Sequence, residues 1–278
     1  MKNIKVLKEK YEKKFARKIK KDFNLSEEEG SLHCSIMSEI WAYFECIIPE
    51  DFIKYSLFDL HGITEGENQL DPKIFIKAKN ILCKYCWGAE WQKIDEIYKS
   101  DEKEIRNFTW HNSVMERRLR KGENVIIFGT SIEPIGKTIF ASIIMKEAIK
   151  LRRKPGFKGQ TYEWVDLAIL QRALLNEKES NEIGNYRTCD WLVVDNINRM
   201  DFTSVKQREY ISSLLNPFFI ERCKNKLPTI LVLRFDIENC INIEEAVGLG
   251  IANIFNSKRT YKIRLSPKLE YNKKNGEQ

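Results

Sequence analysis

The sequence predicts an α/β fold in which a five-stranded parallel sheet lies between helices. From about residue 101 onward, short apolar runs alternate with helical stretches, which is typical of a parallel sheet covered on both faces. The first hundred residues show only helical patterning, with apolar residues at three- and four-residue spacing. We therefore expect a small α-helical N-terminal domain at 1–100, an α/β core at 101–266 and a flexible tail at 267–278.

Composition restricts the class of protein further. The 278 residues are 42% hydrophobic and 31% charged, which is enough apolar material for a sizeable core. No run of about 18 apolar residues occurs, and the first residues lack a signal segment, so we expect a cytoplasmic chain that does not enter a membrane. The seven cysteines are odd in number and scattered, which favours reduced thiols over a disulfide framework.

The first helix is expected within the first 23 residues, and it carries the positive charge. Residues 1–22 hold ten Lys/Arg and three Asp/Glu, a net of +7 that equals the net charge of the whole chain. Between the lysines, apolar residues recur at helical spacing at Ile4, Leu7, Tyr11, Phe15, Ile19 and Phe23. Such a helix can dock on its own protein, on a partner, or along nucleic-acid phosphates. A membrane surface is disfavoured because no Trp/Leu-rich face accompanies the basic one.

Two more helices are expected before residue 100. The segment "SIMSEIWAYFECI" places Ile36, Ile40 and Phe44 on one stripe. The segment "DPKIFIKAKNILCKYCWG" has Pro72 at its first helical position and closes with Gly88, which are typical start and stop signals.

The elements of the α/β core follow in order. A helix at 101–121 leads into the first strand, and another helix follows that strand and stops at Pro155-Gly156. The strands are expected at 124–128, 161–165, 191–195, 229–233 and 260–265. Ligands of such sheets bind beyond the carboxyl ends of the strands. The site is therefore expected where the loop after the first strand meets the ends of the third and fourth.

That loop, "FGTSIEPIGKT", resembles the phosphate-binding pattern G-x-x-x-x-G-K-[ST], whose backbone N–H groups cradle a polyphosphate. Ser131 stands where the first glycine belongs, and the nearest glycine, Gly129, lies two residues earlier. Lys137 is expected to bridge the β- and γ-phosphates, and Thr138 to offer its hydroxyl to Mg²⁺. The predicted nucleotide-binding residues are Gly129, Thr130, Ser131, Ile135, Gly136, Lys137, Thr138 and Ile139.

The strand "WLVVD" supplies the second half of the expected site. It ends in Asp195, and a carboxylate at such a strand end holds the metal or its water shell. We expect Thr138 and Asp195 to hold Mg²⁺ and the site to bind ATP. The alternative is an α/β fold in which a Gly-Lys-Thr helix start has lost its ligand.

With these parts assembled, the chain resembles the DnaC/IstB-type AAA+ ATPases over about residues 46–265. The resemblance lies in "CIIPEDFIKYSLFDL" at 46–60, "KGENVIIFG" before the loop, "CDWLVVDNI" at the Asp195 strand and "ERCKNKLPTILVL" at the fourth strand. It implies a P-loop NTPase of the AAA+ class, a replicative-helicase loader that contacts single-stranded DNA and a hexameric helicase and forms homo-oligomers in its ATP state. An IstB-like transposition helper shares the chemistry and differs in its partner.

The chain departs from that family at the hydrolytic positions. The carboxylate expected after Asp195 is replaced by Asn196, which cannot take a proton from water. The polar residue expected at the end of the fourth strand is replaced by Arg234, which can bind a γ-phosphate without positioning water. We count Lys137, Asp195, Asn196 and Arg234 as the catalytic set. Binding is therefore better supported than turnover, and a non-hydrolysing scaffold for a protein partner is the alternative.

The arginines that the family supplies across subunit boundaries are also missing from their usual places. The segment "GIANIF" has Gly250 and Ile254 at those two positions. Arg259, one turn further on, and Arg222 are the candidates to substitute for them.

Cys83 and Cys86 form a C-x-x-C pair, and some loaders that resemble this chain carry an N-terminal zinc module. A second C-x-x-C is absent from the sequence, and two cysteines three apart on a helix are more often packing residues than metal ligands. The pattern leaves both interpretations open.

Overall fold

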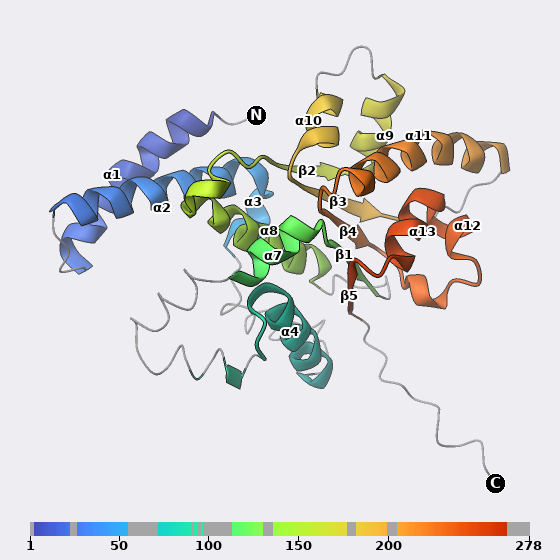
Figure 1. Ribbon diagram of the computed structural model, residues 1–278, viewed down its shortest axis with the longest axis horizontal. Coiled ribbons are helices and arrows are strands. Elements are labelled where there is room, and N and C mark those ends of the chain that lie inside the picture. Colours follow the sequence, from blue (N-terminus) through green and yellow to red (C-terminus); the bar gives the residue numbers. More distant parts are fainter. Residues whose placement is uncertain are drawn as a thin grey trace, which may run out of the picture.

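Five strands form one parallel sheet at the centre of the structure, a computed structural model (Figure 1). The structure describes residues 3–22, 27–54, 72–90, 92–93, 96, 113–129, 136–176, 182–198 and 205–265. The strands are β1 Asn124–Phe128, β2 Tyr162–Asp166, β3 Trp191–Ile197, β4 Thr229–Leu233 and β5 Thr260–Arg264. Their order is β2-β3-β4-β1-β5, and every neighbouring pair is parallel. The sheet confirms the predicted α/β fold class.

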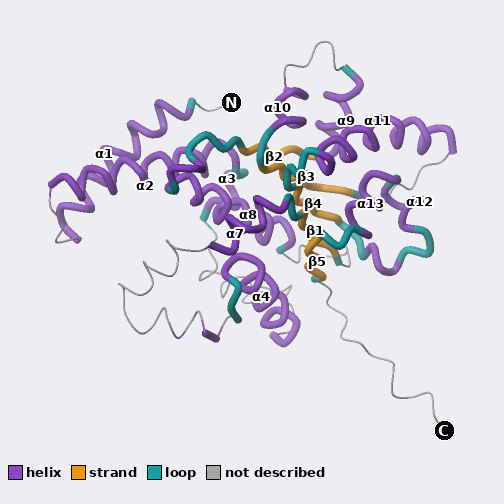
Figure 2. The backbone as a smooth tube through the Cα atoms, in the orientation of Figure 1, coloured by secondary structure: helices purple, strands orange, loops and turns teal. Residues whose placement is uncertain are grey.

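Helices cover both faces of this sheet (Figure 2). Alternate residues of a strand point to opposite faces, so Val125 and Ile127 of β1 enter one core cluster while Ile126 and Phe128 enter the other. The first cluster is covered by α2 Glu27–Ile47, α3 Glu50–Ile53, α4 Pro72–Trp87, α7 Ser113–Lys121 and α8 Lys137–Lys150. The second is covered by α9 Leu167–Leu175, α10 Glu182–Thr188, α11 Val205–Lys224, α12 Ile243–Val247 and α13 Leu249–Asn256.

The basic first helix, α1 Ile4–Asp22, lies along α2 (Figure 1). Leu7 and Tyr11 of α1 are buried. The Tyr11 hydroxyl donates to Glu45 Oε2, on α2, at 2.7 Å. Of the three predicted binding modes for this helix, docking on its own protein is therefore the one that the structure shows.

The N-terminal helices share their core with the sheet. Phe44 of α2 and Leu82 of α4 belong to the same buried cluster as Val125 and Phe140. The α4 helix begins at Pro72 and is followed by Gly88 at φ 72°, as its start and stop signals predict. The predicted boundary near residue 100 lies outside the described residues.

Several element ends differ from the sequence prediction. The α8 helix ends at Lys150, before the predicted stop, and continues as 3-10 turns η2 Leu151–Arg153 and η3 Pro155–Phe157. The extended backbone of Lys154 (φ −79°, ψ 133°) separates the two turns, because a residue that precedes proline avoids helical angles. The β3 strand runs two residues past Asp195, to Ile197. The described start of α7 is Ser113, and the predicted helix at 101–112 lies outside the described residues.

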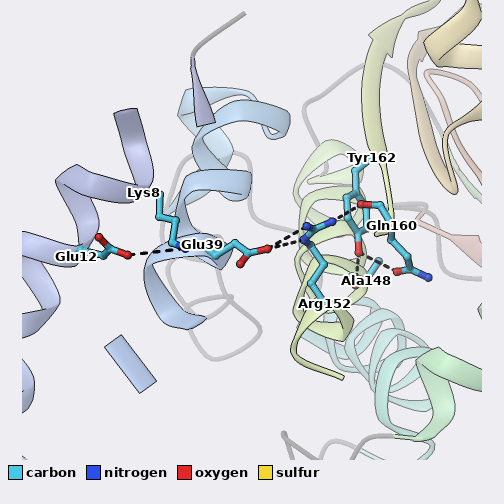
Figure 3. A network of polar contacts seen from close by, with 7 residues as sticks. All are labelled: Lys8, Glu12, Glu39, Ala148, Arg152, Gln160 and Tyr162. Atoms are coloured by element: carbon cyan, nitrogen blue, oxygen red, sulfur yellow. Dashed lines mark hydrogen bonds and ion pairs between the residues drawn. The ribbon is translucent and has the colours of Figure 1, made fainter. Parts of the chain in front are cut away.

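The η2 turn that follows α8 contacts α2 through Arg152 (Figure 3). Its Nε and Nη2 atoms donate to Glu39 Oε1 at 3.1 and 3.0 Å, and its Nη1 donates to the carbonyl of Gln160. The guanidinium also lies over the Tyr43 ring, 4.0 Å from its centroid. Among the helices in the described ranges, none has the length and apolarity needed to span a membrane.

Candidate nucleotide-binding site

The predicted site residues meet at the carboxyl ends of three neighbouring strands. Gly129 follows β1, Asp195 lies near the end of β3, and Arg234 follows β4. The α8 helix begins beside them at Lys137. β1, which precedes the predicted phosphate loop, and β3, which carries Asp195, both pair with β4 in parallel. Their carboxyl ends therefore lie at the same edge of the sheet, where a parallel sheet binds its ligand.

Gly136 caps α8 and Lys137 is the first residue of that helix. Gly136 is the N-cap at φ 75° and ψ 13°, a left-handed conformation that favours glycine. The Lys137 side chain is 9% exposed, and its Nζ donates to the Gly129 carbonyl at 3.3 Å. Burial and the nearby charge of Arg234 lower the pKa of Lys137 to about 8. A phosphate anion would offset that cost, because an opposite charge favours the ammonium form.

Gly129 is required by its close approach to the last strand. Its φ is 149°, and a Cβ at this position would lie 1.4 Å from the Leu265 carbonyl oxygen. Its own N–H donates to the Phe235 carbonyl at 3.2 Å. The glycine therefore holds the start of the loop between the chain segments that leave β4 and β5.

Thr138 and Asp195 supply the oxygen atoms expected at a magnesium site. Thr138 Oγ1 lies 3.5 Å from Asp195 Oδ1, and Asp195 is 6% exposed. Burial raises the pKa of Asp195, although the backbone N–H of Asn196, the Thr138 hydroxyl and Arg234 all lower it. Hydroxyl and carboxylate oxygens are hard ligands that suit Mg²⁺, so the residues present fit this ion.

The Asn196 side chain, on β3, contacts residues at the ends of both neighbouring strands, β2 and β4. Its Nδ2 donates to Asp166 Oδ2 at 2.6 Å, and its Oδ1 accepts from Nε and Nη2 of Arg234 at 2.9 and 2.5 Å. The sequence analysis did not identify Asp166. Its position at the end of β2, in register with Asp195, is the signal that would have found it.

A second acidic residue, Asp236, also escaped the sequence analysis. It is 6% exposed and accepts from Nε and Nη2 of Arg264 at 3.0 and 2.7 Å. Its charge raises the pKa of Lys137 and so opposes the effect of burial. Asp236 follows β4 and Arg264 ends β5, so this ion pair borders the site on the side of the outer strand.

The structure places the two candidate trans-acting arginines away from this edge. Arg222 is fully buried, and its guanidinium donates to the carbonyls of Tyr186, Cys189 and Pro228 and to the Thr229 hydroxyl. Those partners precede or begin β3 and β4, so Arg222 lies buried at the amino-terminal edge of the sheet. Arg259 is exposed, but it directly precedes β5 at the same amino-terminal edge.

The remaining predicted residues divide into two groups. Ile139 is buried in the core cluster beneath the sheet, so its side chain faces the core. Thr130, Ser131 and Ile135 lie outside the described residues.

The C-x-x-C pair lies in the core. Cys83 and Cys86 are fully buried in the cluster that contains Leu82 and Tyr85. Burial raises the pKa of Cys83 to about 12, which disfavours the thiolate that a metal requires. Over the ranges that the structure describes, no group of three or more His, Cys, Asp or Glu side chains could hold a metal ion. The packing interpretation is the one that these contacts support.

No family model matches the chain, and no curated protein matches it. Solved structures do match. A DnaI structure is 17% identical, with a TM-score of 0.38 over 62% of this chain and 86% of that one. An AMPPCP-bound DnaA from Aquifex aeolicus is 18% identical, with a TM-score of 0.38 over 55% of this chain and 45% of that one. A replication initiator DnaA bound to AMPPCP and single-stranded DNA is 14% identical, with a TM-score of 0.38 over 64% and 50%. This chain therefore spans about half the length of these two DnaA chains. We base its function on the residues of its own site.

Proposed function

We propose that this chain is a cytoplasmic, ATP-binding AAA+ protein of DNA replication that resembles the DnaC-type helicase loaders. In this proposal, bound ATP and Mg²⁺ switch its assembly on single-stranded DNA and a hexameric helicase. The observation that supports it most is the convergence of Lys137, Thr138 and Asp195 at one edge of the sheet.

Each of these residues has a defined task in nucleotide binding. The Lys137 ammonium, next to the start of the phosphate loop, would pair with the β- and γ-phosphates. Thr138 and Asp195 would hold Mg²⁺, which neutralises phosphate charge when it is bound. Arg234, at the end of β4, would meet the terminal phosphate.

Hydrolysis is expected to be weak. Asn196 occupies the position at which a second carboxylate would orient the attacking water, and a carboxamide cannot accept the proton of that water. Both ends of this amide are already bonded within the chain, to Asp166 and Arg234. ATP binding with slow turnover is therefore the favoured form of the proposal.

The basic α1 helix offers a surface for the partners. Its lysines 5, 10, 13 and 14 are exposed, while its buried residues pack on α2. Exposed lysines on one helix attract phosphates through counterion release. This helix is where we expect the helicase or the DNA to contact the N-terminal region.

The Asn196 amide also favours a second candidate function, a scaffold that binds a protein partner and never hydrolyses nucleotide. A phosphate-release assay with single-stranded DNA distinguishes the two. Clear turnover that is lost in Asp195→Ala contradicts the scaffold. A pull-down that recovers a transposase in place of a helicase identifies the chain as an IstB-like helper.

The direct test is calorimetric titration of ATP with Mg²⁺ into the parent protein and into Lys137→Ala. We expect the variant to bind at least about a hundredfold more weakly, since charge-assisted contacts to phosphate are among the strong hydrogen bonds. Lys150→Ala is the matched control, because Lys150 ends the same helix and pairs with Glu147. A parent protein without measurable affinity for ATP contradicts the proposed function.

A further inference from the structure

The Asn196 amide joins three strands of the sheet at their carboxyl ends. It lies on β3, its nitrogen meets Asp166 at the end of β2, and its oxygen meets Arg234 just after β4. A carboxamide has one donor end and one acceptor end. The two neighbours match these ends, because a carboxylate accepts hydrogen bonds and a guanidinium donates them.

Asp166 determines which way this amide points. Its Oδ1 accepts from the Ala168 N–H at 2.8 Å as the N-cap of α9, and its Oδ2 accepts from Asn196 Nδ2. A carboxylate oxygen facing the amide can only receive the NH₂ group. The amide oxygen is thereby directed to Arg234, where it accepts two hydrogen bonds.

The backbone supports the same arrangement. Asn196 has φ 59°, and the pairing of β3 with β4 is irregular between Val194 and Ile197. Among residues with a side chain, Asn and Asp adopt this left-handed conformation most readily. An aspartate here would set its carboxylate against Asp166, and like charges that close are unfavourable. The asparagine is therefore matched to its neighbour as well as to its backbone.

Arg234 is the member of this group that can meet a ligand. Its side chain is exposed, and it follows β4 at the same carboxyl edge of the sheet at which Lys137 begins α8. Its guanidinium retains donors beyond those that Asn196 uses. A ligand that pairs with both cations must carry several negative charges.

We propose that Asp166 is a positioning residue of the nucleotide site: acting through the Asn196 amide, it holds Arg234 where a triphosphate is distinguished from a diphosphate. This inference rests on the proposed nucleotide binding. In this proposal Asp166 on β2 supplies the carboxylate, and Asn196 on β3 supplies the amide that links it to Arg234.

Asp166→Asn tests the link with the smallest possible change. Asparagine is as good an N-cap as aspartate, so the cap of α9 is preserved. The new NH₂ group faces the Asn196 NH₂, and turning either amide leaves a donor against a donor. We expect the preference for ATP over ADP to fall about tenfold, as in Arg234→Ala, because a hydrogen bond to a charged group is lost. Affinity for ADP should change less than about twofold.

Asp190→Asn is the matched control. Asp190 lies at the opposite edge of the sheet, where it accepts from the N–H and hydroxyl of Thr161. This variant should keep the parent preference for ATP. If Asp166→Asn keeps it too, the positioning role is overturned, whatever happens to stability.

An exchange of the two residues completes the test. Asn196→Asp alone should lower the preference for ATP, because two carboxylates then face each other. The double variant Asp166→Asn, Asn196→Asp restores one carboxylate and one amide, and we expect it to recover the parent preference. Additive losses in the double variant overturn the pairing. A parent protein that binds no nucleotide overturns the proposed function itself. A preference for ATP over ADP that is unchanged in Asp166→Asn overturns only this inference.

Discussion

Two arginines at opposite edges of the sheet show how differently this fold uses the same side chain. Arg222, at the amino-terminal edge, is fully buried, and backbone carbonyls accept most of its hydrogen bonds. Arg234, at the carboxyl edge, is exposed, and within the described ranges it donates two hydrogen bonds to one amide oxygen, that of Asn196. From the sequence, both arginines are candidates for a role at the nucleotide site.

The difference lies in the partners. Carbonyls that precede β3 and β4 fix Arg222 as a brace between the two strands, where no ligand can replace them. Arg234 is held by a side chain that is itself held by Asp166, so its position depends on a chain of polar contacts and its remaining donors stay available. The amino-terminal edge is held by buried hydrogen bonds, whereas the carboxyl edge is where we propose that nucleotide binds.

The largest effect expected from this comparison is that of Arg222→Ala. Removing the guanidinium leaves several buried carbonyls without donors, which we expect to lower the free energy of unfolding by about 4 kcal/mol. Urea denaturation measures it. Glu221→Ala is the control, because Glu221 precedes Arg222 on α11 and forms an exposed ion pair with Arg187. An Arg222→Ala protein as stable as its parent contradicts the bracing role.

Gly129→Ala tests whether the close approach of Gly129 to Leu265 fixes the backbone at the carboxyl edge of the sheet. The added methyl would meet the Leu265 carbonyl, and φ 149° is unfavourable for alanine. We expect a loss of about 3 kcal/mol, with ATP binding weakened because the loop start must move. Gly156→Ala is the matched control, since a Cβ there has open space. Equal melting temperatures for the two variants would show that the approach of Gly129 to Leu265 is not constrained.

The fold could be predicted from the sequence because its signals are local. Apolar runs such as 124–128 and 229–233 are strands over the predicted residues, and Pro72 and Gly88 bound α4 as expected. Lys137, Thr138 and Asp195 could be identified because each lies in a motif beside its own strand or helix end. These predictions needed no knowledge of which strands are neighbours.

The rest of the site depends on long-range contacts. Asp166 precedes Asn196 by 30 residues, and only the pairing of β2 with β3 brings them together. Arg222 is a candidate from the sequence, whereas its burial comes from contacts with the chain segments before β3 and β4. No local pattern distinguishes a buried arginine on a helix from an exposed one.

The pH dependence of stability offers a third test, centred on Lys137. Burial lowers the pKa of this lysine to about 8, below the value of about 10.4 for an unfolded chain. Between these two values the unfolded state binds more protons, so the free energy of unfolding should rise with pH across that window. Relative to Lys137→Met, we expect a gain on the order of 1 kcal/mol from pH 8 to 10.4. An equal slope for parent and variant would mean that the buried lysine has an ordinary pKa.

The smallest effect concerns Arg152, an arginine that donates both to a side chain and to a backbone carbonyl. Its side chain is 10% exposed, pairs with Glu39, which is 35% exposed, and donates to the Gln160 carbonyl (Figure 3). It also lies over the Tyr43 ring. Glu39→Ala should cost less than about 1 kcal/mol, because a partly exposed ion pair contributes little. Arg152→Ala should cost more, since a carbonyl acceptor and a ring contact are lost as well.

A double-mutant cycle on Glu39 and Arg152 separates these contributions. A coupling energy below about 1 kcal/mol, together with a larger loss for Arg152→Ala alone, would place Arg152 with the bracing arginine Arg222. A coupling energy that accounts for the whole loss would place it with Arg234, whose position depends on one side chain. Because Arg152 follows the helix that begins at Lys137, the second result would also mean that the Glu39 contact adds to the apolar packing of α2 against that helix.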